Sequence, residues 1–206
     1  MMKKILTVNI GQHTSAGRKD INQDFHGAFV PHDHLLSSKG ITLVIADGIS
    51  SSDVSQIASQ TAVSSVLADY YCTSETWSVK NATQRVLQAT NSWLYAQSRN
   101  SPHRFDRDKG YICTFSALVL KSTTAHLFHI GDTRIYRFAH GKLEQLTTDH
   151  RHFVSEEDSY ITRALGINQQ LDVDYHAFPL EENDTFILSS DGIHEYLSEN
   201  DIIEAI

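Results

Sequence analysis

The sequence is poor in the residues that would build a disulfide scaffold or bind a nucleic acid. Its 206 residues include only Cys72 and Cys113, which form no CxxC pair and are too few for a disulfide framework. This cysteine usage favours a reducing, cytoplasmic location. Seventeen Lys and Arg stand against 25 Asp and Glu, and the formal charge of −8 disfavours nucleic acid and anionic membrane as partners.

Long apolar runs are missing as well. No stretch approaches the roughly 20 apolar residues of a membrane helix, and the opening residues 1–10 resemble no signal peptide, because Asn9 interrupts them and no small-residue cleavage site follows. A hydrophobic content of 40% and a charged content of 20% are ordinary for a globular protein. Without a linker, repeat or low-complexity tract, residues 1–206 are expected to form a single domain.

Two apolar runs end in the same three residues. Residues 41–49 read ITLVIADGI and residues 185–193 read TFILSSDGI, so each run predicts a buried strand with an aspartate, Asp47 or Asp191, at its end. Asp-Gly alone is a common turn, and only its return after a second strand indicates a shared site. A third acid, Asp132, follows another apolar run.

These three acids suggest a metal site. Carboxylates at strand ends, without Cys or clustered His, favour Mg²⁺ or Mn²⁺ over Zn²⁺. The twelve histidines show no His-Glu-x-x-His spacing, and we expect most of them to be solvated. A hard-metal site in turn favours a phosphate ester as substrate, because divalent ions neutralise phosphoryl charge and activate water.

Two helices are predicted in the middle of the chain. Apolar residues at three- and four-residue spacing indicate one helix from Ser51 to about Tyr70, capped by Ser52 or Asp53, and a second from about Trp77. Both apolar stripes are interpreted as surfaces that face a core.

Strands are predicted from β-branched and aromatic runs at residues 5–10, 111–120, 125–130, 133–139 and 184–190. The three middle runs follow one another closely and are expected to be antiparallel neighbours, with tight turns at Gly131-Asp132 and, after the third run, at His140-Gly141. The order of the predicted elements, with two helices followed by strands that join the earlier strands, favours an α+β sandwich of mostly antiparallel sheets covered by helices.

The polar segment 17–25 allows two interpretations. It is a solvated turn, or it is a segment in which Lys19 or Arg18 receives an anion while Asp24 faces a metal. Its composition does not decide between them.

Six motifs in order resemble the metal-dependent protein Ser/Thr phosphatases (PPM family, type 2C), and most closely the bacterial members. They cover nearly the whole chain and comprise residues 17–24 with the ending Asn22-Gln23-Asp24, Ala46-Asp47-Gly48, Gly131-Asp132-Thr133-Arg134, Leu146-Thr147-Thr148-Asp149-His150, Thr162-Arg163-Ala164-Leu165-Gly166 and Ser190-Asp191-Gly192. The resemblance implies an α-β-β-α sandwich of two mostly antiparallel sheets flanked by helices, with metals in a cleft at one end. It also implies hydrolysis of phosphoserine and phosphothreonine in phosphoproteins, with a protein kinase, fused or encoded nearby, as a further partner.

The resemblance assigns each acid a role. Asp47 would bridge two Mn²⁺ or Mg²⁺ ions, with the carbonyl of Gly48 on one ion and Asp191 on the other. Asp24 would hold metal-bound waters, and Asp132 with Asp191 would suit a weaker third ion. A hydroxide between the two metals would attack phosphorus in line and displace the Ser or Thr oxygen.

Several positions depart from the family pattern. Lys19 stands where many members have a phosphate-binding Arg, which weakens bidentate binding unless Arg18 substitutes. Ile49 replaces a His of some eukaryotic members, and residues 112–114 replace a Gly-Thr-Thr motif, a change that we interpret as packing. The flap, residues 151–161, is short and acidic; it is expected to be a solvated loop rather than a barrier to acidic phosphopeptides, and it should leave an open cleft.

The end of the chain is the largest departure. The family's last motif, an Asp-Asn, has no counterpart before Ile206, and the final helix, predicted to be capped by Ser198 with Asp201, is cut off early. We therefore expect a domain truncated at its C-terminus, with a weakly held second metal and impaired activity. The alternative is an inactive or weakly active phosphatase-like domain that binds a phosphoprotein or a kinase.

Overall fold

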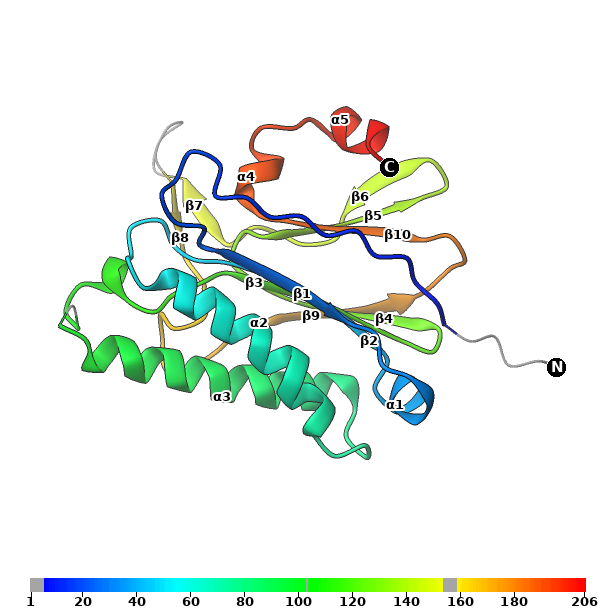
Figure 1. Ribbon diagram of the computed structural model, residues 1–206, viewed down its shortest axis with the longest axis horizontal. Coiled ribbons are helices and arrows are strands. Elements are labelled where there is room, and N and C mark those ends of the chain that lie inside the picture. Colours follow the sequence, from blue (N-terminus) through cyan, green and yellow to red (C-terminus); the bar gives the residue numbers. More distant parts are fainter. Residues whose placement is uncertain (1–5, 103, 154–158) are drawn as a thin grey trace.

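The chain forms two packed antiparallel sheets with helices on both outer sides (Figure 1). The computed structural model describes residues 6–102, 104–153 and 159–206. The larger sheet has the order β1-β2-β3-β4-β9, with bounds Asp24–Phe29, Ile41–Asp47, Phe115–Lys121, Thr124–Ile130 and Asp174–Pro179. The smaller has the order β10-β5-β6, with bounds Thr185–Ser189, Arg134–Ala139 and Lys142–Gln145. The expected α-β-β-α sandwich is confirmed.

Two apolar layers hold the sandwich together. One lies between the larger sheet and two long helices, α2 (Ser55–Cys72) and α3 (Val79–Asn100), and includes Phe115 and Phe128. The other lies between the sheets and includes Leu118, Leu127 and Ile135. Strand β2 is mostly apolar, with Thr42 and the terminal Asp47 as its polar residues, because α2 covers one face and β10 approaches the other.

Shorter elements complete the fold. They are α1 (Asp33–Ser38), the 3-10 turn η1 (Arg107–Lys109), the hairpin of β7 (Arg151–Phe153) and β8 (Ser159–Ile161), α4 (Asp191–His194) and α5 (Glu199–Glu204). Helices α4 and α5 lie beyond the smaller sheet in Figure 1. No described helix is long and apolar enough to span a membrane.

The helix predictions are correct in place and only partly correct at the ends. The predicted caps of α2 are wrong: its N-cap is Val54, and the Ser52 hydroxyl donates to the Gly110 carbonyl at 2.8 Å instead. Helix α3 is capped by Ser78, which accepts from the Asn81 amide at 3.2 Å. The apolar stripe of α3 does not face the core along its whole length, because Trp93, which lies on it, is 44% exposed.

At the end of the chain, the predicted capping box of α5 is present. The Ser198 hydroxyl accepts from the Asp201 amide, and the Asp201 carboxylate accepts from the Ser198 amide at 2.8 Å. Both cysteines are free, as expected from their spacing.

The strand predicted at residues 5–10 is wrong for residues 6–10, which form no strand, while residue 5 lies outside the described residues. Leu6 and Val8 nevertheless pack against the core between the sheets, so the apolar alternation reflects packing without a backbone ladder. The alternation alone did not distinguish these two cases.

The predicted pairing of 125–130 with 133–139 is also wrong. β4 pairs with β3 and β9, whereas β5 pairs with β10 and β6 in the other sheet. Gly131-Asp132 is therefore a crossover between sheets. Gly131 has φ +109°, and a Cβ there would collide with the Thr114 side chain, so glycine permits this close approach. The predicted turn at His140-Gly141 does join β5 to β6, and both residues have positive φ.

Candidate metal centre

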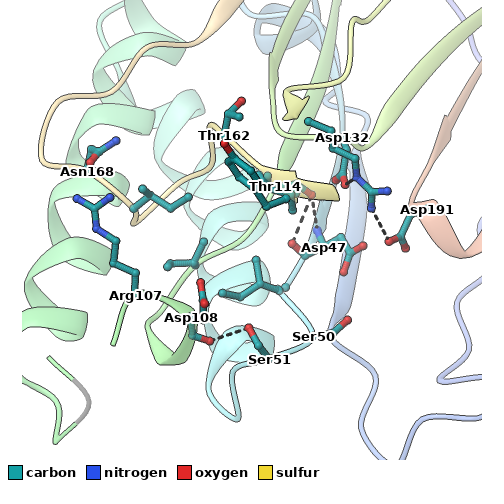
Figure 2. Close-up of a pocket in the computed structure, with 17 residues that line it drawn as sticks. Asp47, Ser50, Ser51, Arg107, Asp108, Thr114, Asp132, Thr162, Asn168 and Asp191 are labelled. Carbon is teal, nitrogen blue, oxygen red and sulfur yellow. Dashed lines mark hydrogen bonds and ion pairs between the residues drawn. The ribbon is translucent and has the colours of Figure 1, made fainter. Parts of the chain in front are cut away.

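Four aspartates from separate elements meet at one end of the sandwich. Asp24 begins β1 and Asp47 ends β2, and the two are direct partners in the antiparallel register. Asp132 lies in the crossover between β4 and β5, and Asp191 begins α4. Asp47, Asp132 and Asp191 line one side of a cavity of about 760 Å³, opposite Arg107 and Asn168 (Figure 2). The predicted acids are therefore brought together.

Hydrogen bonds fix the ends of these strands. The Ser190 hydroxyl donates to Asp24 Oδ2 at 2.8 Å and ties the start of β1 to the end of β10. The Asp47 amide donates to Thr114 Oγ1 at 3.2 Å, and the Thr114 amide donates to the Asp47 carbonyl at 2.8 Å. Thr114, predicted to be a packing residue, thus also positions the backbone of Asp47 and lines the cavity.

Gly48 follows Asp47 where no side chain fits. A Cβ at this position would lie 2.7 Å from the backbone of Ser55, the first residue of α2. The glycine lets the helix start pack directly against the end of β2, and Gly48 lines the cavity beside Asp47.

Asp47 is buried without a compensating cation. Its residue is 8% exposed, and burial, followed by the negative charges of Asp24, Asp191 and Asp132, raises its pKa to about 10. Within residues 6–102, 104–153 and 159–206, no Lys, Arg or His forms an ion pair with Asp47 or Asp24. A divalent cation would supply the missing positive charge.

The donor set fits a hydrated hard cation. In the described part of the chain, no three His, Cys, Asp or Glu side chains form a ready-made metal-binding group. Mg²⁺, however, is commonly held by one or two carboxylates together with waters, and Asp47 and Asp24 offer carboxylates of this kind. The absence of Cys and His from this wall of the cavity also fits Mg²⁺ or Mn²⁺ better than Zn²⁺.

The Asp132 and Asp191 side of the cluster does contain a cation, which the sequence reasoning missed. Arg151, at the start of β7, bonds Asp132 Oδ2 through Nε, Asp191 Oδ2 through Nη2 at 3.2 Å, and Glu195 Oε1 through Nη1 at 2.6 Å. Burial raises the pKa of Asp132, and Arg151 opposes that shift. Arg151 lies at the edge of an irregular flap, and no sequence pattern there indicates that its side chain reaches the acids.

The two candidate phosphate-binding residues differ in position. Lys19 Nζ donates to Ser50 Oγ at 2.9 Å, and Ser50 lines the cavity, so Lys19 lies at the rim. Arg18 is exposed and makes no hydrogen bond or ion pair with any described residue. The arrangement favours Lys19 over Arg18 for contact with an anion in the cavity.

His150 holds the crossover that carries Asp132. Its amide donates to the Gly131 carbonyl at 2.7 Å, and the Gly131 amide donates to His150 Nδ1 at 3.0 Å. Its Nε2 lies 3.0 Å from Asp174 Oδ2, and its ring stacks on His129 with 4.9 Å between centroids. The motif around His150 was noted in the sequence, but this role was not predicted.

The predicted flap is described only in part. Residues 151–153 and 159–161 pair as β7 and β8, and Tyr160, Ile161 and Thr162 line the cavity. The acidic residues 156–158 lie outside the described residues, so both interpretations of their charge stay predictions. Ile49 lines the cavity as an apolar side chain.

Comparisons with known proteins agree with this geometry. The family model described as protein phosphatase 2C matches residues 12–205. A protein phosphatase 2C-type protein of Streptococcus pyogenes is 28% identical, over 98% of this chain and 83% of its own length. The serine/threonine phosphatase Stp of Listeria innocua is 27% identical, over 94% and 81%.

Among solved structures, the Mycobacterium tuberculosis serine/threonine phosphatase PstP superposes with a TM-score of 0.73 at 23% identity, over 91% of this chain and 79% of that one. A structure of the PstP catalytic domain with two manganese ions gives a TM-score of 0.70 at 24% identity, over 91% and 78%. At these identities the structural likeness concerns the fold.

Proposed function

The chain belongs to the protein phosphatase 2C family, and on this premise we propose that it hydrolyses phosphoserine and phosphothreonine in proteins with the help of divalent metal ions. The observation that carries the proposal is the buried carboxylate of Asp47, which faces three further aspartates and no described cationic partner. Mn²⁺ or Mg²⁺ suits this oxygen donor set, and the manganese complex of PstP supports that choice.

Each acid has a proposed role at the site. Asp47, Asp191 and the carbonyl of Gly48 would hold the two ions, and Asp24 would orient waters beside them. When bound, the ions lower the pKa of water and neutralise charge on the phosphoryl group. The Ser190 hydroxyl keeps Asp24 oriented, since it donates to Asp24 Oδ2 at 2.8 Å.

Other residues bind the substrate. Lys19 at the rim neutralises the phosphoryl group as a point charge, without the bidentate fork of an arginine. The cavity of about 760 Å³ accepts a phosphorylated side chain, and its far wall, with Arg107 and Asn168, faces the flanking peptide. Holding the phosphoryl group beside the ions supplies the proximity that an in-line displacement requires.

The proposal extends to partners and location. A phosphoprotein is the substrate, and a protein kinase, fused or encoded nearby, is the enzyme class that must supply it. The two free cysteines, Cys72 and Cys113, favour the reducing cytoplasm as the place of action.

Phosphate release from a phosphothreonine peptide tests the proposal. We expect release that depends on Mn²⁺ and is abolished by EDTA. Asp47→Asn should lower kcat/KM by at least about 100-fold, because the ions supply several kcal/mol of transition-state stabilisation and each 1.36 kcal/mol is a factor of ten. Asp108→Asn, in the same cavity but exposed, is the matched control and should keep near wild-type activity. Full activity in Asp47→Asn would refute the assignment.

A further inference from the structure

Arg151 occupies the position between two carboxylates that the family resemblance assigns to a third metal. Its guanidinium reaches Asp132 and Asp191 through different nitrogens and takes Glu195 as a third partner. One side chain thus spans the pair that a cation would have to bridge.

The contacts belong to a largely enclosed site. The Asp132 side chain is 2% exposed, and those of Arg151 and Asp191 are 19% and 31% exposed. At this burial a carboxylate needs a fixed counter-charge, because the desolvation cost of an unpaired ion is several kcal/mol. The Arg151 guanidinium carries that charge at every pH relevant to the protein, since arginine is effectively always protonated in proteins.

A divalent ion between Asp132 and Asp191 would therefore have to displace Arg151. Guanidinium and metal cannot share the position, because like charges in a poorly solvated site repel strongly. Arg151 binds only Oδ2 of Asp191, and no described donor reaches Asp191 Oδ1. That oxygen is free for the ion that Asp191 shares with Asp47, so the two proposed metals are unaffected.

We propose that Arg151 takes the place of the third metal ion, so that this chain binds one ion fewer than the Asp132–Asp191 pair would otherwise permit. The inference deepens the proposed function and rests on it. On this proposal the Asp132–Asp191 pair holds no third ion: both acids are present, but Arg151 already lies between them.

The test counts metal ions and does not rely on turnover. Wild type and Arg151→Ala are dialysed to equilibrium against Mn²⁺ from micromolar to millimolar, and bound manganese per folded chain is measured by elemental analysis. We expect Arg151→Ala to bind one ion more than wild type, and Arg151→Ala/Asp132→Asn to lose that ion again. An equal count in wild type and Arg151→Ala would overturn the inference. Arg151→Gln, which keeps much of the side chain, is the second neutral variant if Arg151→Ala folds poorly.

Two further variants test whether the contact of Arg151 with the two acids matters, or only the positive charge in the cavity. Arg107→Ala removes one positive charge from the same cavity without touching Asp132 or Asp191, and it should keep the wild-type count. Arg151→Lys keeps the charge at the site and should also keep the wild-type count. A gain of an ion in either variant would count against replacement by Arg151.

Failure of the inference can be told apart from failure of the proposed function. If wild type hydrolyses the phosphothreonine peptide but gains no ion in Arg151→Ala, the inference is wrong and the function stands. If Arg151→Ala gains the ion but wild type releases no phosphate with Mn²⁺, the function is wrong and the replacement stands.

Discussion

The two halves of the acidic cluster, Asp24 with Asp47 and Asp132 with Asp191, are built and neutralised differently. The first pair results from the register of adjacent strands, and no described cation faces it. The second joins a crossover to a helix start, and Arg151 bridges it. Buried charge is tolerated in the absence of ligand where the chain supplies its own counter-charge. Where it does not, the folded state is destabilised until a ligand binds.

The largest effect on stability is expected from removing Arg151, the residue that neutralises Asp132 and Asp191. In EDTA, Arg151→Ala should lower the free energy of unfolding by about 3 kcal/mol, because it leaves a buried carboxylate unpaired. For a chain of this size that corresponds to a fall in Tm of roughly 6–12 °C, measured by thermal denaturation. Arg107→Ala should stay within about 0.5 kcal/mol of wild type. A similar Tm for both variants would mean that Arg151 does not compensate Asp132.

In the other half, Asp24 with Asp47, removing a charged group should raise the free energy of unfolding instead of lowering it. In EDTA, Asp47→Asn should raise the free energy of unfolding by about 1–2 kcal/mol, because it removes a buried carboxyl that the folded chain must otherwise keep protonated among three other acids. The pKa of Asp47 rises from 3.8 to about 10 on folding, so the folded state binds more protons and its stability falls as pH rises between these values. The gain in Asp47→Asn should therefore be larger at pH 8 than at pH 5.5 in urea denaturation.

The exposed acid Asp108 provides the control for this comparison, and Asp108→Asn should change stability little at either pH. A loss of stability in Asp47→Asn at pH 8 would contradict the view that this half is destabilised without metal.

A third effect, seen as a slope of stability against pH, is expected behind the Asp132 half, where His129 stacks on His150. Burial, together with the charge of His150, lowers the pKa of His129 from 6.5 to about 4. As pH falls, His129 is therefore protonated in the unfolded chain at a higher pH than in the folded chain. The free energy of unfolding is lost between about pH 6.5 and about pH 4, by at most about 1.4 kcal/mol per pH unit. Urea denaturation between pH 7 and 4.5 should show a shallower slope in His129→Gln. His176→Gln, an exposed histidine in β9, should keep the wild-type slope.

Local patterns predicted part of this arrangement well. The run before Asp47 is largely apolar because β2 is mostly buried, and the run before Asp191 forms β10, which is half-buried apart from the buried Ser189. The aspartates at the ends of both runs were identified from the sequence alone. The capping box of Ser198 and Asp201 was likewise readable, because it depends on a spacing of three residues.

Other parts depended on contacts that no local pattern encodes. Gly131-Asp132 looked like a hairpin turn, since turn chemistry is the same whether the next strand pairs with its neighbour or enters another sheet. The segment 6–10 alternates as a strand would but has no pairing partner. Thr114 appeared to fill space, and its bonds to Asp47 follow from the alignment of β2 beside β3.

By itself, the sequence determined that Asp47 and Asp191 lie at the ends of strands, because an apolar run followed by Asp-Gly is a local signal. Only the tertiary structure decided which of those carboxylates receive a positive charge from the chain. Arg151 lies in a short hairpin far from Asp191 along the chain, and its contact with both Asp132 and Asp191 arises from the packing of the two sheets. The attraction between two charges depends on the distance between them in space. The distance from the Arg151 guanidinium to the two carboxylates is set only when the sheets have packed.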